Sequence, residues 1–213
     1  MILLNIALSL IISYLIGSIP TAYIAGRLKG IDIRQHGSGN VGATNAFRVL
    51  GKVPGSIVLL IDVAKGIIPV TLIGDAFGLE GVLPRILLAI CVVVGHNWTI
   101  FLNFKGGKGM ATSLGVLIGL TFEITAIRPV LGLSVLLWGI VFLSTGFVSL
   151  ASVIAAVFLP VWMIVLKQST ELIVLGIIFC VFIVLRHRSN IERLLKNQES
   201  RVRFSFFKKS PSS

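Results

Sequence analysis

Residues 148–166 read VSLASVIAAVFLPVWMIVL, a stretch of nineteen residues without a charged side chain. A helix needs about 20 apolar residues to cross the hydrocarbon core of a bilayer, because each residue advances the helix by about 1.5 Å. A single segment can satisfy its own backbone hydrogen bonds in lipid only when it is helical. This stretch therefore predicts a transmembrane helix and places the chain among integral membrane proteins.

Similar runs recur along the 213 residues, of which 55% are hydrophobic and 13% charged, a composition too apolar for an ordinary soluble domain. We predict six spans, at 3–24, 54–73, 84–101, 129–147, 148–166 and 172–185. A shorter run at 110–122 predicts a seventh helix, in which Gly115 and Gly119 have the spacing of close helix packing. Chance in a glycine-rich chain explains that spacing equally well. The predicted fold class is an all-α integral membrane protein with about seven transmembrane helices, one of them short.

The distribution of Lys and Arg predicts the orientation, because cytoplasmic loops carry an excess of these residues. With seven crossings and the N-terminus outside, the outer loops keep only Arg85, Arg128 and Lys167 of the 19 basic residues. We expect residues 1–201 to form one transmembrane domain and residues 202–213 to form a basic, disordered cytoplasmic tail. The net charge of +11 suits anionic lipid headgroups or phosphorylated solutes. Nucleic acid is not expected as a partner, because no soluble domain is present to bind it.

Three polar segments interrupt the apolar pattern on the predicted cytoplasmic side. The first is QHGSGNVGATNAFRVLGK, residues 35–52, whose GxGxxG spacing does not predict a dinucleotide site because a membrane helix precedes it instead of a strand. Its glycines let backbone N–H groups approach an anion closely, and Arg48 can bind a phosphate through two parallel hydrogen bonds. Further polar donors are Ser38, Asn40, Thr44 and Asn45. A solvated turn with an inside-facing arginine explains the segment equally well.

The second polar segment is FKGGKG, residues 104–109, which lies between two apolar runs. Lys105 and Lys108 supply positive charge, while Gly106, Gly107 and Gly109 let backbone amides and the start of the next helix approach an anion. A loop that only anchors the chain at the inner membrane face needs lysines but has no need of three glycines. The segment therefore favours a phosphate site.

The third polar segment is RHRSNIERLLKNQESR, residues 186–201, which follows the last span. The apolar spacing of Ile191, Leu194 and Leu195 predicts a short amphipathic helix along the membrane surface. His187 and Asn190 are three residues apart and share one face of that helix, and a histidine can hold or pass a proton near neutral pH. Polybasic anchoring explains the arginines of this segment but leaves His187 and Asn190 unexplained.

Two further polar features lie inside the spans. Asp62 and Lys65, three residues apart in IDVAKG, predict a structural ion pair, because unpaired charges at membrane depth are costly. His96 in GHNW, residues 95–98, is read as a hydrogen-bonded histidine at a helix end. The eight acidic residues are scattered and the three histidines fall in three different segments, so we expect no metal and no cofactor.

In this order and spacing, the three segments resemble the signature motifs of the bacterial acyl-phosphate:glycerol-3-phosphate acyltransferase family. GSGNVGATNAFRVLGK resembles the first motif, GHNWTIFLNFKGGKGMATSLG the second and RHRSNIERLL the third, and the resemblance runs from about Gly17 to Arg201. It implies transfer of a fatty acyl group from acyl phosphate to the sn-1 hydroxyl of glycerol 3-phosphate, which yields lysophosphatidic acid and inorganic phosphate. It also implies the bacterial inner membrane, with a cytoplasmic active site and C-terminus. Whether the soluble enzyme that makes acyl phosphate docks on this protein stays open.

The resemblance assigns roles to residues of all three segments. Those expected to bind substrate phosphate are Arg48, Thr44, Asn45, Lys105, Gly106, Gly107, Lys108 and Gly109. Those expected to be catalytic are Ser38, Asn40, His187 and Asn190, with Ser38 and Asn40 directed at the acyl phosphate and the developing oxyanion. Arg48 serves either the acceptor or the donor phosphate. The base is open between His187 and a phosphate oxygen of the substrate.

Two alternatives remain at the level of sequence. Acyltransferases that use acyl-CoA or acyl carrier protein rely on a His-x4-Asp pair, and His187 is followed by Glu192 at that spacing. Helical geometry disfavours this pair, because residues five apart point about 140° apart. The other alternative is a membrane transporter or channel for a phosphorylated solute, which predicts polar lining toward both membrane faces.

Overall fold

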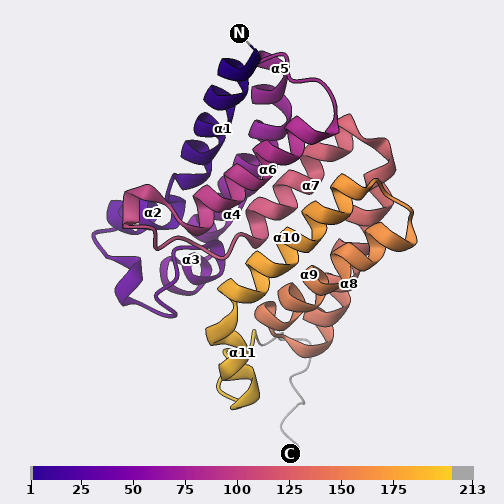
Figure 1. Ribbon diagram of the computed structural model, residues 1–213. Helices are drawn as coiled ribbons and strands as arrows, with labels where there is room; N and C mark the ends of the chain where they lie inside the picture. The colour runs from indigo at the N-terminus through magenta and orange to yellow at the C-terminus, as the bar shows by residue number, and fades with distance from the viewer. Residues whose placement is uncertain (1, 203–213) are drawn as a thin grey trace, which may run out of the picture.

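The computed structural model describes residues 2–202, and every regular element in that range is helical. The tail expected at 202–213 lies outside the described residues, except for Val202. The elements are α1 (Ile2–Ser18), α2 (Thr21–Leu28), η1 (Ile33–Gln35), α3 (Ala43–Leu50), α4 (Lys52–Ile68), η2 (Pro69–Ile73), α5 (Gly74–Ala76), α6 (Val82–Asn97), η3 (Ile100–Leu102), α7 (Met110–Glu123), η4 (Thr125–Ile127), α8 (Arg128–Thr145), α9 (Val148–Val165), α10 (Thr170–Arg186) and α11 (Arg188–Leu195). Figure 1 shows them as one bundle.

The predicted fold class is confirmed. Four helical stretches are long and apolar enough to cross a membrane, namely Lys52–Ala76, Val82–Leu102, Thr125–Thr145 and Val148–Val165. Two more qualify if α1 with α2, bent by 41°, and α10 with α11, bent by 60°, each count as one span. The apolar helix α7 is shorter, as its sequence predicts.

A contact at the C-terminal end of α7 shows toward which end of the bundle this helix runs. Its first residue follows the loop that carries Lys108. Its last residue, Glu123, lies 3.6 Å from the guanidinium group of Arg85, which also pairs with Asp75 at 2.5 Å. Asp75 belongs to α5, which lies at the same end of the bundle as the N-terminus (Figure 1). The short helix therefore runs from the loop that carries Lys108 toward the end of the bundle that bears the N-terminus (Figure 1).

The expected single helix over residues 3–24 is wrong, because the chain breaks between α1 and α2. Pro20 has no backbone N–H and cannot continue the hydrogen-bond ladder of α1. The carbonyl groups at the break find other partners, since Ser18 accepts a hydrogen bond from Thr99 and Ile19 accepts one from Lys65 at 2.8 Å. The break is thus satisfied by side chains from elsewhere in the bundle.

The predicted pair of Asp62 and Lys65 is confirmed. The Lys65 ammonium lies 2.7 Å from the Asp62 carboxylate, and both side chains are almost completely buried. Each charge compensates the other in a medium where an isolated charge is costly. Lys65 also donates to the Ile19 carbonyl, which accepts a further hydrogen bond from the backbone N–H of Thr21 at 3.0 Å, so α4 helps to hold the break between α1 and α2 in place.

Close packing of α4 on α7 confirms the role expected for the glycine spacing in α7. A Cβ atom on Gly115 would lie 2.0 Å from the carbonyl oxygen of Val63, and one on Gly66 would lie 2.1 Å from the carbonyl oxygen of Thr112. A Cβ atom on Gly119 would lie 2.3 Å from the side chain of Val70. The two backbones can approach this closely only because these positions lack side chains.

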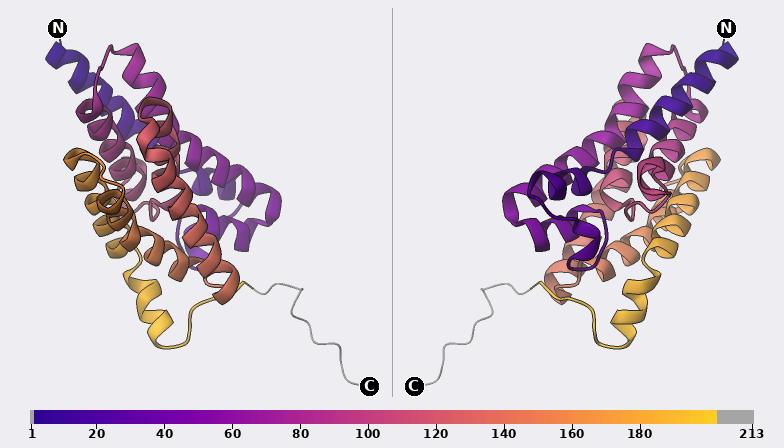
Figure 2. Two further views of the ribbon diagram at one scale, coloured as in Figure 1. Left: turned by 90° about the vertical axis from the view of Figure 1, so that its right-hand side faces the viewer. Right: turned by 90° about the vertical axis from the view of Figure 1, so that its left-hand side faces the viewer.

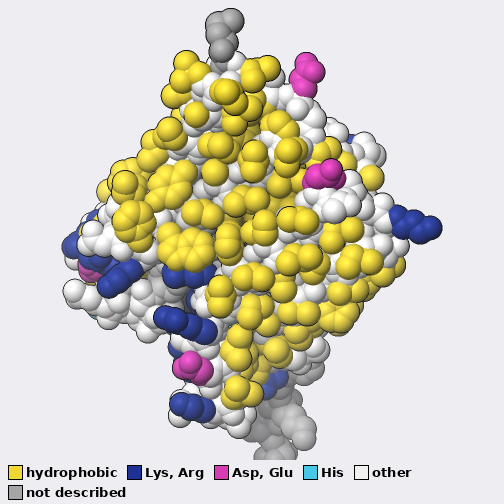
Figure 3. All heavy atoms as spheres, viewed as in Figure 1, with side chains coloured by type: hydrophobic (Ala, Val, Ile, Leu, Met, Phe, Trp, Pro, Cys, Tyr) yellow, Lys and Arg dark blue, Asp and Glu magenta, His cyan; other side chains and the backbone are white. Residues whose placement is uncertain are grey.

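The outer surface divides by chemistry along the bundle. Apolar side chains cover most of the face seen in Figure 3, and Lys and Arg side chains gather in its lower half. Figure 1 and the side views of Figure 2 place α3 and α11 in the half of the molecule away from the N-terminus. The first and third polar segments therefore lie toward the same end of an apolar bundle.

Substituting Gly115 by Ala tests the packing of α4 on α7. We expect Gly115→Ala to lower the free energy of unfolding by about 1–3 kcal/mol, because the added methyl group overlaps backbone atoms of α4. Gly139→Ala on α8 is the matched control, since a Cβ atom there meets nothing within 4 Å. Thermal denaturation of the purified proteins in detergent measures both. Equal stability of the two variants would contradict the packing described here.

Candidate functional site

One cavity of about 650 Å³ lies among α3, α4, α7, α8, α9, α10 and α11. Its polar lining includes Ser38, Asn40, Thr44, Arg48, Lys108, His187, Asn190, Arg193 and Glu199. Its apolar lining includes Leu114, Leu117, Leu131, Val135, Trp138, Leu159 and Ile183. The cavity thus joins all three polar segments to a groove between membrane helices.

The first polar segment is held in shape by Asn45. The side-chain oxygen of Asn45 accepts a hydrogen bond from the backbone N–H of Ser38 at 2.9 Å, and its amide nitrogen donates to the carbonyls of His36 and Ile33. Asn45 is 1% exposed, and its amide hydrogens are already used. Its side chain therefore shapes the loop and is not free to bind a phosphate in this structure.

The other predicted residues of this segment reach the cavity. Ser38, Thr44 and Arg48 are exposed, Asn40 is half-buried, and all four line the cavity. Ser38 follows Gly37, which has a left-handed backbone (φ 61°) and would clash with the Asn45 side chain if it carried a Cβ atom. Glycine at this position is required both for the turn and for the approach of Asn45.

In the second segment, Gly106 and Gly107 take a role that differs from the expected one. Their N–H groups donate to the carbonyls of Asn97 at 3.1 Å and His96 at 2.9 Å, so neither is free for an anion. A Cβ atom on either glycine would lie 2.1 Å from an atom of His96. The two glycines pack the loop against α6 and do not line the cavity. The exposed Lys105 does not line it either.

Arg186 ties this loop to the third segment. Its guanidinium group donates to the carbonyl of Gly107 at 2.9 Å and to that of Gly106 at 2.7 Å. The same group lies 5.8 Å from the centre of the Trp98 ring, within reach of a cation–π contact. The next residue is His187, so Arg186 sets the position of the glycine loop relative to the histidine.

Lys108 is the residue of the glycine loop that faces the site. It is half-buried, lines the cavity with Gly109, and donates a hydrogen bond to the side-chain oxygen of Asn190. Burial, with a smaller contribution from nearby arginines such as Arg193 and Arg48, lowers the pKa of Lys108 to about 8, and the charge of Glu199 opposes this shift. A bound anion would favour the charged form. Lys108 therefore suits a site for a phosphate group, beside the N-terminus of α7.

Glu199 is a site residue that sequence reasoning did not single out. Its carboxylate accepts hydrogen bonds from Asn190 at 2.6 Å, Arg193 at 2.7 Å and Ser149 at 2.9 Å. Burial alone would raise the pKa of Glu199, but these hydrogen bonds outweigh it and lower the pKa. The available sequence signal was that Glu199 is one of only two acids, with Glu192, in a strongly basic segment. Its partners on α9 and α11 were not predictable from spacing.

His187 is 4% exposed and lines the cavity at the junction of α10 and α11. Its Nδ1 lies 2.7 Å from the carbonyl oxygen of Ile183. Because a carbonyl can only accept, Nδ1 carries the hydrogen, and Nε2 of the neutral ring keeps a lone pair. Glu192 is exposed, and Nδ1 of His187 is bonded to Ile183 instead of to this acid. The arrangement disfavours the His-x4-Asp alternative.

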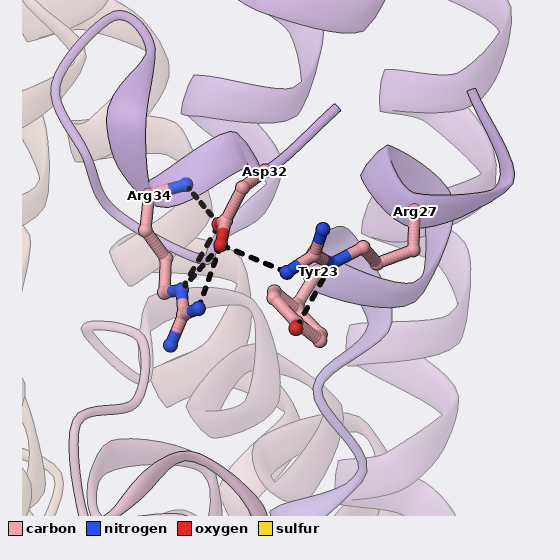
Figure 4. A network of polar contacts seen from close by, with 4 residues as sticks. All are labelled: Tyr23, Arg27, Asp32 and Arg34. Atoms are coloured by element: carbon pink, nitrogen blue, oxygen red, sulfur yellow. Dashed lines mark hydrogen bonds and ion pairs between the residues drawn. The ribbon is translucent and has the colours of Figure 1, made fainter. Parts of the chain in front are cut away.

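A separate cluster of charges lies outside the cavity lining. Asp32 accepts hydrogen bonds from Arg34 at 2.6 Å and Arg27 at 3.2 Å, and both guanidinium groups stack against the ring of Tyr23 (Figure 4). The Arg34 hydrogen bond holds the pKa of the Asp32 carboxyl below its usual range. These cations are occupied in tying α2 to the loop before α3.

Within residues 2–202, no group of three His, Cys, Asp or Glu side chains is arranged to hold a metal ion.

Comparisons with known proteins agree in their result. Residues 7–197 match the family model described as glycerol-3-phosphate acyltransferase. A glycerol-3-phosphate acyltransferase of Synechococcus sp. (strain CC9902) is 43% identical over 202 residues, which cover 94% of this chain and 96% of the relative. One from Desulforudis audaxviator (strain MP104C) is 45% identical over 195 residues, which cover 91% of this chain and 93% of the relative.

Two solved structures have the same fold. The crystal structure of PlsY (YgiH), an integral membrane glycerol 3-phosphate acyltransferase, in its glycerol 3-phosphate form has a TM-score of 0.84 and 37% identity, with 93% of this chain and 96% of that chain covered. The lysophosphatidic acid form of the same protein has a TM-score of 0.81 and 36% identity, with 93% and 95% covered. On the family match, the identities and the shared fold, this chain belongs to the glycerol-3-phosphate acyltransferase family.

Proposed function

We propose that this protein transfers a fatty acyl group from acyl phosphate to the sn-1 hydroxyl of glycerol 3-phosphate and releases lysophosphatidic acid and inorganic phosphate. One observation carries this proposal. A single cavity joins a cationic end, with Arg48, Lys108 and Arg193, to an apolar groove between membrane helices. Both substrates bear a phosphate, and the donor also bears a hydrocarbon chain. A cavity of this composition can hold the phosphates and the chain at the same time.

The apolar end suits the fatty chain. Leu117, Leu131 and Trp138 come from α7 and α8, and Leu159 from α9 completes the groove. Burial of hydrocarbon contributes about 0.8 kcal/mol for each CH₂ group removed from water. A donor with a long chain therefore binds with its chain in the groove, and its carbonyl lies at the boundary with the polar end.

The chemistry needs no covalent intermediate on the protein, because an acyl phosphate is a mixed anhydride and already activated. The hydroxyl oxygen of the acceptor attacks the carbonyl carbon, the bond from that carbon to the donor phosphate oxygen breaks, and phosphate leaves. Lys108 and Arg48 offset the negative charge of the phosphates, and Asn190 orients Lys108. Ser38 and Asn40 are our candidates for donors to the developing oxyanion.

We propose that a phosphate oxygen of the substrate accepts the proton of the attacking hydroxyl group. His187 then orients the substrate through a hydrogen bond. A protonated His187 would place a second positive charge next to Lys108 in a buried site, which burial and like charge both disfavour. A phosphate monoester has a second pKa near 6 and can accept a proton without this cost. The Nε2 atom of His187 remains available for a hydrogen bond to the substrate.

We place the protein in the bacterial inner membrane with the polar end of the cavity facing the cytoplasm. The distribution of Lys and Arg supports this orientation, since the predicted inner segments, residues 27–52, 104–109 and 186–209, carry 15 of the 19. The polar lining of the cavity comes from the end of the bundle that bears α3 and α11. A transporter would need comparable lining toward the opposite face, so the acyltransferase is favoured.

The donor is tested by acyl transfer in detergent or lipid with labelled glycerol 3-phosphate. Palmitoyl phosphate, palmitoyl-CoA and palmitoyl carrier protein are supplied separately. We expect lysophosphatidic acid from palmitoyl phosphate alone, because neither thioester brings a phosphate next to its carbonyl. Product from the thioesters alone would contradict the proposal and direct attention to His187 with Glu192.

The titration of Lys108 predicts a pH dependence. In the free enzyme its pKa is about 8, so raising the pH through 8 removes the charge that binds phosphate, and kcat/KM for glycerol 3-phosphate should fall. In Lys108→Arg the guanidinium stays charged, and we expect the decline near pH 8 to disappear. Lys105→Arg is the matched control, because the exposed Lys105 lies outside the cavity and its variant should keep the wild-type profile. If kcat/KM of Lys108→Arg still falls near pH 8, the assignment of this decline to Lys108 is wrong.

Substitution of His187 separates the two candidate proton acceptors. Glutamine can replace the hydrogen bond of Nε2 but is not a base, so we expect His187→Gln to keep kcat within about tenfold of the wild type. We expect His187→Leu, which loses the hydrogen bond, to be more impaired. A drop of about 10²- to 10⁴-fold in kcat for His187→Gln, measured with both substrates saturating, would make His187 the general base.

A further inference from the structure

Three polar residues of the cavity have no part in the mechanism above. Asp62 of α4, His96 of α6 and Ser113 of α7 line the same cavity as Lys108 and are 1%, 7% and 3% exposed. Buried polar side chains in a membrane protein are costly, and they mark functional sites more often than chance. The chemistry of these three side chains suits a polar ligand without negative charge.

The position of Ser113 relative to Lys108 follows from the first turn of α7. The backbone N–H of Ser113 donates to the carbonyl of Gly109 at 2.7 Å, so Ser113 lies one helical turn below the residue next to Lys108. Four residues of helix advance about 6 Å. Glycerol 3-phosphate has about this length from its phosphorus to its far hydroxyl. A phosphate at Lys108 therefore places the glycerol part of the molecule at the level of Ser113.

The hydroxyl group of Ser113 is buried, and within the described part of the chain its Oγ atom has no hydrogen-bond partner. Ser113 also adjoins Leu114, which lines the apolar groove, so it stands at the boundary where acceptor and donor must meet. Leaving such a buried hydroxyl unpaired is unfavourable, and a hydroxyl-bearing ligand would remove that penalty.

The carboxylate of Asp62 determines which end of an acceptor can lie beside Ser113. This carboxylate is compensated by Lys65 at 2.7 Å, and its nearer oxygen lies 3.9 Å from Nδ1 of His96. A carboxylate accepts hydrogen bonds from hydroxyl groups but repels phosphate. The cavity therefore has a cationic end and a hydroxyl-accepting floor. An acceptor would enter with its phosphate toward Lys108 and its hydroxyls toward Asp62.

A nucleophilic role for Ser113 is not supported. A Ser-His-Asp arrangement requires a hydrogen bond between the serine and the histidine, and Oγ of Ser113 makes none. The Nε2 atom of His96 instead faces Gly107, whose Cβ atom would lie 2.1 Å from it. Ser113 is thus placed to bind substrate, and His96 to support Asp62 beneath the glycine loop.

We propose that Asp62 and Ser113 bind the secondary hydroxyl of the acceptor and thereby select a monophosphate that carries a vicinal diol. This inference rests on the proposed function, since it assigns specificity within the same cavity. An acceptor that lacks the secondary hydroxyl leaves Ser113 and Asp62 unpaired in the complex. Sites built to hydrogen-bond a hydroxyl group reject analogues without it far more strongly than apolar pockets reject a missing methylene.

The test compares two acceptors, glycerol 3-phosphate and 3-hydroxypropyl phosphate, which lacks only the secondary hydroxyl. We expect the wild type to prefer glycerol 3-phosphate by at least about 100-fold in kcat/KM. Ser113→Ala should reduce this preference by about tenfold or more, chiefly through loss of activity with glycerol 3-phosphate. The variant is expected to fold, because no hydrogen bond of the Ser113 side chain within residues 2–202 is lost.

Ser134→Ala is the matched control. Ser134 of α8 is also buried, lines the same cavity and has no hydrogen-bond partner for its hydroxyl within the described chain, but its neighbours Leu131, Val135 and Trp138 belong to the apolar groove. We expect Ser134→Ala to leave the preference within about threefold of the wild type. A similar change in both variants would overturn the proposal, because it would indicate a general effect on the cavity.

Asp62→Asn provides the second variant, with thermal stability measured alongside, since it leaves Lys65 without its counter-ion. A folded Asp62→Asn protein with a reduced preference supports the proposal, and one with the full wild-type preference contradicts it. If Asp62→Asn does not fold, Ser113→Ala decides alone. Unchanged preference in Ser113→Ala, with normal turnover of glycerol 3-phosphate, overturns the inference and leaves the proposed function standing. Absence of any turnover by the wild type would instead refute the proposed function.

Discussion

The structure depends on one constraint, which is that irregular backbone next to a membrane must find its hydrogen bonds inside the protein. Arg186 meets it for the carbonyls of Gly106 and Gly107, and Lys65 meets it for Ile19 at the break between α1 and α2. Asn45 does the same for the loop that carries Ser38. Each of these side chains both satisfies a loop and fixes its position. The polar site is consequently built on loops that side chains from other parts of the chain hold in position.

The charged side chains of the cavity likewise find their partners inside the protein. Several cations line one end of the cavity, and their mutual repulsion in a buried site has to be offset when no anion is bound. Glu199 supplies part of that offset through hydrogen bonds to Arg193 and Asn190, and Asn190 in turn accepts from Lys108. The ion pair of Asp62 and Lys65 is electrically separate from this set, because each partner neutralises the other. The cavity can therefore offer positive charge at one end and a hydroxyl acceptor at its floor.

Sequence reasoning succeeded where a feature depends on local composition and failed where it depends on distant partners. Apolar runs predicted the membrane helices, and the three-residue spacing of Asp62 and Lys65 predicted their pairing. The single helix expected at 3–24 was wrong, because Pro20 breaks it and the break is stabilised by Lys65 of α4 and by Thr99, which follows α6. Gly106 and Gly107 were read as an anion cradle, yet the space they leave is filled by His96. Glu199 was missed because its partners lie on α9 and α11.

The sequence by itself determined the class of this protein, the number of its apolar segments and the three polar segments from which residues line the cavity. These properties follow from hydropathy and from residue types at short spacing, which act locally along the chain. Only the tertiary structure decided which polar groups face a common cavity. Lys108 and Asn190 are 82 residues apart and make contact only because the glycine loop packs on α6 while Arg186 holds it against the end of α10. Such contacts are set by helix packing, and no spacing in the sequence encodes them.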